Sequence, residues 1–194
     1  MQSLTSPLHS MRLRLPARNE ILQVFGVVIF AVFGWSIRGF LYKIPAFTLY
    51  FGLGSNLAIL CYMFAFALLE SLLVTGALLL AAVVLPARAL AKGFAYKGFV
   101  VILVTSIAMI LFEGYFRVDF FKQIMAGDDS SIPPFVIGLI ASVLAVIALF
   151  WLVRIQPFLQ KAVLYVMEQL SVFTYIYVPL GLIGAVVVLI RNLR

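Results

Sequence analysis

One uninterrupted apolar segment, Asn56 to Leu85, constrains the fold of this chain more than any other feature of its sequence. It contains thirty residues without a proline, and its one charged residue is Glu70, close to the middle. As a helix the segment would be about 45 Å long, whereas the hydrocarbon core of a bilayer is about 30 Å thick. The segment therefore predicts a membrane-spanning helix with Glu70 near the midplane. A carboxylate at that depth is unfavourable by about 2.5 kcal/mol or more, so we expect it to face protein or water rather than lipid.

The composition also indicates an integral membrane protein, because 65% of the residues are hydrophobic and only 11% are charged. Soluble domains carry about 25% charged residues on average. The formal net charge is +7, and the basic residues lie at the ends of the apolar segments, where they would set topology and meet anionic headgroups. We therefore expect a lipid bilayer as a partner and no nucleic acid.

The chain offers few residues for chemistry, with a single cysteine, Cys61, and a single histidine, His9. A disulfide within the chain, a cysteine metal site and histidine-ligated haem or chlorophyll in a spanning helix are thereby excluded. The sequence also contains no phosphate-binding loop, no paired-glycine dinucleotide turn and no Ser-His-Asp set. We therefore expect a protein that is not an enzyme and that uses no cofactor and no metal.

The apolar segments predict an all-α fold, a polytopic transmembrane helical bundle of about five spans with interfacial segments. We expect a cytoplasmic tail over residues 1–19 and a single transmembrane domain over residues 20–194, with spans over residues 21–37, 56–85, 99–116, 135–153 and 165–190. With the N-terminus inside the cell, eight basic residues fall in cytoplasmic segments and six in outer ones. The excess favours a cell-membrane protein with a cytoplasmic N-terminus and an outward C-terminus.

Three segments are expected to interrupt this simple pattern. Gly39 to Ser55 is interrupted by Pro45, Gly52 and Gly54 and contains five aromatic rings, and it predicts an interfacial elbow, with a re-entrant loop as the alternative. Arg117 to Met125 mixes charged and apolar residues and predicts a short interfacial helix. In the last segment, Ala162 to Ile190, we expect the first part to lie at the interface and Pro179 to kink the helix.

Small residues at helical spacing predict the faces on which the helices pack, because small side chains allow close approach in lipid. The first span contains Gly26 and Gly34, the second contains Ala67, Ser71 and Thr75, and the fourth contains Gly138 and Ser142.

The candidate functional residues are the acids in or near the spans, Glu70, Glu113 and Glu168, since intramembrane acids are often functional. They could carry protons or a cation. Alternatively, each could be hydrogen-bonded to a neighbouring hydroxyl or paired with a basic residue near a helix end. The polar residues that accompany them as candidates are Ser71, Thr75, Ser106 and Tyr175.

One longer pattern is familiar. A basic loop and an apolar span are followed by Glu113 to Phe121, EGYFRVDFF, and the second span opens with Leu49 to Gly54, LYFGLG. This arrangement resembles the five-helix N-terminal membrane domain of lipoteichoic acid synthase-like proteins, which are sulfatase-fold phosphoglycerol transferases. The resemblance covers about residues 20 to 190 and implies a membrane domain without the extracellular catalytic domain of that family. It carries over no catalytic residue, because the metal-bound nucleophile of the family lies in that missing domain.

Three functions are compatible with these features. The first is a non-catalytic multi-pass membrane protein that serves as the membrane domain or accessory subunit of an envelope-directed partner. The second is a small oligomeric ion-coupled transporter that uses Glu70. The third is a structural subunit of a larger respiratory or photosynthetic complex. All three imply a protein partner or a homo-oligomer.

Overall fold

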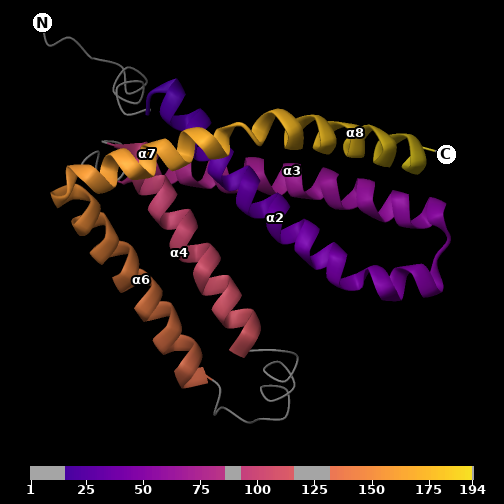
Figure 1. Ribbon diagram of the computed structural model, residues 1–194, viewed down its shortest axis with the longest axis horizontal. Coiled ribbons are helices and arrows are strands. Elements are labelled where there is room, and N and C mark those ends of the chain that lie inside the picture. Colours follow the sequence, from indigo (N-terminus) through magenta and orange to yellow (C-terminus); the bar gives the residue numbers. More distant parts are fainter. Residues whose placement is uncertain (1–15, 86–92, 116–131, 194) are drawn as a thin grey trace, which may run out of the picture. The chain divides into compact units, whose positions relative to one another are not determined.

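A computed structural model describes residues 16–85, 93–115 and 132–193 of the chain. These residues form helices and no strand, which confirms the predicted all-α class (Figure 1). Five of the helices are long and apolar enough to cross a membrane. The predicted interfacial helix over residues 117–125 and most of the predicted tail lie outside the described residues. The helices are α2 (Arg18–Tyr50), α3 (Leu53–Val84), α4 (Phe94–Tyr115), α6 (Ile132–Ile155), α7 (Pro157–Ser171) and α8 (Thr174–Asn192).

The elbow predicted over residues 39–55 does not interrupt the backbone as expected, because α2 remains helical through Pro45 to Tyr50. The predicted break in the helix was therefore wrong. A helical proline lacks the N–H that would bond to the preceding turn. In this turn the Thr48 hydroxyl donates to the carbonyls of Ile44 (3.0 Å) and Pro45 (3.1 Å). An apolar chain still gains from staying helical here, since its other backbone polar groups are then satisfied within the helix. The reversal between α2 and α3 occupies only residues 51–52.

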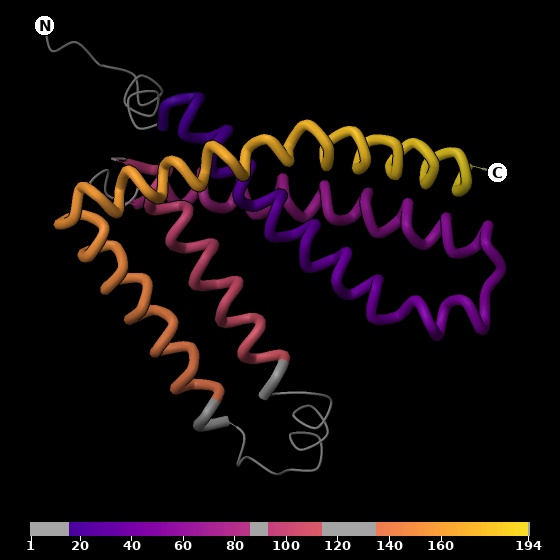
Figure 2. Tube along the Cα trace, in the orientation of Figure 1, coloured from indigo at the N-terminus to yellow at the C-terminus, as the bar shows by residue number. Residues whose placement is uncertain are grey.

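The chain divides into two compact units, one of residues 1–95 with 164–194 and the other of residues 96–163. The prediction of a single transmembrane domain over residues 20–194 remains a prediction. In the first unit α2 and α3 form an antiparallel hairpin, and α8 runs alongside α3 in the opposite direction (Figure 2). At the hairpin end the Tyr62 hydroxyl donates to Asn192 Oδ1 at 2.9 Å, which joins the start of α3 to the end of α8.

The core of the first unit is apolar and aromatic. Ile29 and Phe33 of α2 pack against Ala67 and Leu68 of α3, and all four are buried. The ring of Phe33 stacks on Tyr177 of α8, with 4.7 Å between the ring centroids. Further ring contacts extend this stack to both sides, between Phe33 and Phe64, between Phe173 and Tyr177, and between Phe30 and Phe173. The rings therefore join all three helices.

Glycines set the distance between α8 and α3. A Cβ at Gly184 would lie 2.5 Å from the Cys61 carbonyl oxygen, and one at Gly181 would lie 2.6 Å from Leu68 Cβ. Neither position leaves room for a side chain, so the two backbones approach each other directly. The predicted face of Ala67, Ser71 and Thr75 is buried, as the small-residue pattern indicated.

The small residues of the first span behave differently from each other. A Cβ at Gly26 would lie 2.7 Å from Ser171 Cα, so a neighbour does approach α2 closely there. A Cβ at Gly34 would meet nothing within 4 Å. The prediction of a shared contact face is therefore right for Gly26 and wrong for Gly34.

The last apolar segment breaks earlier than predicted. Helix α7 ends at Ser171 and α8 begins at Thr174, whereas Pro179 lies inside α8. At the break the N–H of Phe173 donates to the carbonyl of Leu170 at 3.1 Å, a three-residue spacing typical of a tightened helical turn. The break places the Phe173 ring between Phe30 and Tyr177. The interruption of the helix therefore coincides with the packing of the Phe173 ring and not with Pro179.

The second unit contains α6, most of α4 and the first part of α7. Val100 and Val104 of α4 are buried with Val153 of α6, which defines a small apolar core. Near the other end a Cβ on Gly138 would lie 2.7 Å from the ring of Phe112. The start of α4 therefore lies beside the end of α6, and the end of α4, at Phe112, lies beside the start of α6, at Gly138. The two helices are antiparallel.

We expect Gly184→Ala to destabilise the protein by about 1–3 kcal/mol, because the added methyl would overlap the Cys61 carbonyl and force α8 away from α3. The matched control is Gly76→Ala on the exposed side of α3, where a Cβ would meet nothing within 4 Å. Alanine also favours a helix, so the control should be neutral or slightly stabilising. Thermal unfolding in detergent, followed by tryptophan fluorescence, measures both, and equal stability of the two variants would contradict the close α3–α8 contact.

Candidate functional site

Glu70 lies near the middle of α3 and is exposed, although the next residue, Ser71, is completely buried. Its neighbours on the same helical face are apolar and exposed, with Phe66 63% and Leu73 65% accessible. Helices α2 and α8 pack on the other face of α3, where Ala67, Leu68 and Ser71 are buried. Neither of these two helices therefore covers the carboxylate.

Ser71 and Thr75, the polar candidates beside Glu70, turn their hydroxyls to their own helix. The Ser71 hydroxyl donates to the Ala67 carbonyl at 2.7 Å, and the Thr75 hydroxyl donates to the Ser71 carbonyl at 2.8 Å. Such bonds to the preceding turn satisfy a hydroxyl in an apolar interior without a partner helix. Both residues thus fill the packing face and present no free donor to the Glu70 side.

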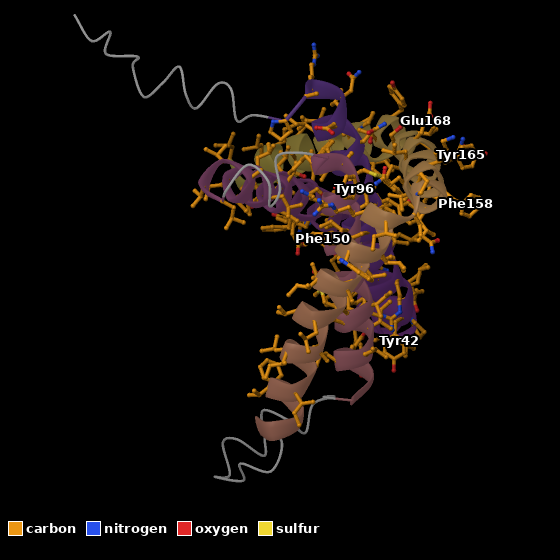
Figure 3. The ribbon with its side chains drawn as sticks, turned by 90° about the vertical axis from the view of Figure 1, so that its left-hand side faces the viewer. Tyr42, Tyr96, Phe150, Phe158, Tyr165 and Glu168 are labelled. Atoms are coloured by element: carbon orange, nitrogen blue, oxygen red, sulfur yellow. The ribbon has the colours of Figure 1, made fainter. Side chains whose placement is uncertain are left out.

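Glu168 and Tyr175 lie in the same unit as Glu70 but at another level. Leu68 lies against Gly181. At 1.5 Å per residue, Glu70 lies about 3 Å along α3 from this level and Glu168 lies roughly 20 Å from it. Because α8 is antiparallel to α3, both residues lie on the same side of the level. Figure 3 shows Glu168 projecting outward from α7 beside Tyr165. Both Glu168 and Tyr175 are exposed, and the break at residues 172–173 places them on two different helices.

The remaining candidates, Glu113 and Ser106, belong to the second unit. Glu113 is exposed near the end of α4, and Ser106 is half-buried two turns earlier. Within the first unit the described helices hold Glu70 and Glu168 apart. No group of three His, Cys, Asp or Glu side chains suited to a metal occurs among the described residues.

The structure also picks out polar residues that the sequence pattern did not. Asn56 Oδ1 and Thr174 Oγ1 are buried without a hydrogen-bond partner among the described residues. Lys97, in the first turn of α4, is only 8% exposed. The available sequence signal for Lys97 was its position, since it is followed directly by the apolar run of the third span. No comparable signal marks Asn56 or Thr174.

Comparison with known proteins adds no relative: no family model matches the sequence, no curated protein matches it, and no solved structure matches it.

We expect Ser71→Ala to change the free energy of unfolding by less than about 1 kcal/mol, because the lost hydrogen bond lies within one helix. Ser71→Leu should destabilise by about 1–3 kcal/mol, because the site is fully buried. Thermal unfolding in detergent measures both. A large loss of stability in Ser71→Ala would show that the hydroxyl has a partner beyond its own helix.

Proposed function

We propose that the protein is a non-catalytic multi-pass protein of the cell membrane, with a cytoplasmic N-terminus, that acts as a membrane domain or accessory subunit of an envelope-directed partner. The observation that supports this proposal is the exposed carboxylate of Glu70 in the middle of a 32-residue apolar helix.

A carboxylate at this position requires a partner. Facing lipid near the midplane it would be unfavourable by about 2.5 kcal/mol or more. The residues around it on α3 are apolar and offer no hydrogen bond: Phe66, Leu69 and Leu73. The partner is therefore a transmembrane helix that brings a lysine, an arginine or a hydrogen-bond donor to the depth of Glu70.

Transport through Glu70 is the weaker candidate. A proton or cation path needs several polar groups around the carboxylate, as intramembrane relays have. The nearest polar side chains on α3, Ser71 and Thr75, are buried on the other side of the helix and bonded to its backbone.

We expect Glu70→Gln to weaken association with the partner about tenfold, because a hydrogen bond to a charged group contributes about 1.5–3 kcal/mol. Glu168→Gln is the matched control, since it removes the same charge from an exposed position on α7. The measurement is the amount of partner that co-purifies with each tagged variant from the native membrane in mild detergent. A fully assembled Glu70→Gln complex would overturn the proposed role of the carboxylate.

A photo-cross-linking residue at Leu73, one turn beyond Glu70, identifies what covers this face. An adduct with a different protein supports the accessory role and names the partner. An adduct with a second copy, together with loss of proton or cation flux in Glu70→Gln proteoliposomes, would replace it by the transport function.

A further inference from the structure

Five exposed residues of α3 form a row on the side that α2 and α8 leave free, and we call this row the outer seam: Phe66, Leu69, Leu73, Gly76 and Leu80. Successive members are alternately three and four residues apart. This spacing is that of a left-handed helix pair, in which each side chain of the row fits between side chains of the facing helix. The outer seam therefore has the pattern of a surface that packs against one further helix.

The outer seam takes no part in the core of the first unit. Its apolar side chains are between 51% (Leu69) and 67% (Leu80) accessible, whereas Ala67 and Ser71 on the other face of α3 are buried. Gly76 is also exposed, and a Cβ there would meet nothing within 4 Å. Glycine is unfavourable inside a helix, but in lipid it lets a second backbone come close. Gly76 is therefore suited to contact with a helix from outside this unit.

Glu70 lies at the edge of the outer seam, directly after Leu69 in the sequence. In paired helices the positions that flank the seam carry the charges that select the partner, through salt bridges to the facing helix. The exposed carboxylate lies between the levels of Phe66 and Leu80, within the length of the seam. A helix seated on the seam meets one negative charge there, and the complementary group is a lysine or an arginine at the same depth.

The spans of this chain supply no such cation. Glu70 is the one charged residue of α3, so a second α3 offers no positive charge. In α4, α6 and α8 each basic residue lies within three residues of a helix end, and these are Lys97, Arg154 and Arg191. In α2 the stretch between Arg18 and Arg38 contains no basic residue. A second copy of the chain is therefore not complementary to Glu70 at mid-depth.

We propose that the outer seam is the docking surface for one transmembrane helix of a different membrane protein, which brings a lysine or an arginine to the depth of Glu70. This inference rests on the accessory function proposed above and adds the face, the helix geometry and the charge that the partner uses. The leucines supply the packing. The ion pair fixes the depth of the partner, because a displaced helix would leave both charges unpaired in the hydrocarbon.

The test uses a model helix of known chemistry. The labelled full chain is reconstituted in liposomes with a labelled peptide of about 20 leucine and alanine residues, long enough to span the bilayer, with one lysine at its centre. A peptide with leucine at the centre is the comparison. We expect energy transfer to show about tenfold tighter binding of the lysine peptide, as for one charged hydrogen bond. A central lysine reaches the depth of Glu70 in either orientation of the peptide.

Glu70→Gln should remove the preference for the lysine peptide. Glu168→Gln is the matched control, because it removes a carboxylate from an exposed position on α7, and it should keep the preference. Equal binding of the two peptides by wild-type protein would overturn the ion pair. A preference for lysine that survives in Glu70→Gln would overturn it as well.

The double variant Leu69→Ala with Leu73→Ala should weaken the binding of both peptides several-fold, because it shortens two exposed side chains of the outer seam. Its control is Leu182→Ala with Ile183→Ala, which shortens two equally exposed side chains of α8. Thermal unfolding in detergent checks that both double variants fold. Unchanged binding in the Leu69→Ala, Leu73→Ala variant would show that the peptide docks elsewhere, against the proposal.

Two further measurements separate the possible occupants. If differently labelled copies of the protein associate in liposomes without peptide, and Glu70→Gln abolishes this, the seam binds a second copy and the assignment to a different protein is wrong. The accessory function itself fails if no other protein co-purifies from the native membrane. The seam alone fails if a partner does co-purify and a photo-cross-linking residue captures it at Ile183 but not at Leu69 or Leu80.

Discussion

The direct backbone contact between α8 and α3 holds the first unit together. Helices in lipid gain little from burying apolar side chains against each other, so their association depends on close packing. Gly181 and Gly184 allow that packing, because any side chain at either position would overlap Leu68 or the Cys61 carbonyl. The aromatic stack of Phe33 and Tyr177 then joins α2 to the pair.

The same contact decides which side of α3 is free. With α8 and α2 seated on the face of Ala67 and Ser71, the opposite face with Glu70 and Leu73 remains exposed. If α3 were apolar on both faces, this side could face lipid. The carboxylate prevents that, and it is the physical reason for proposing a partner helix rather than a self-contained bundle.

Charge has a different role in the second unit. At one end of the α4–α6 pair, Lys97 lies close enough to Arg154 for the two positive charges to repel each other. Basic residues at this level are usual for topology, since cytoplasmic ends of spans are positively charged. Burial of Lys97 goes beyond that rule, because a topological charge need only be near the surface.

The sequence by itself determined the all-α class and the approximate positions of the apolar helices, because length and hydropathy alone decide whether a segment can span a bilayer. It also identified Glu70 as the unusual charge and the buried stripe of Ala67, Ser71 and Thr75. It misplaced two backbone features, the end of α2 and the break before α8. Proline and glycine give only local preferences, and in both places continued backbone bonding or ring packing overrode them. Only the tertiary structure decided that Gly184 is a contact while Gly34 is not. It alone also turned Glu70 outward and buried Lys97, since the facing residues in each case come from distant parts of the chain.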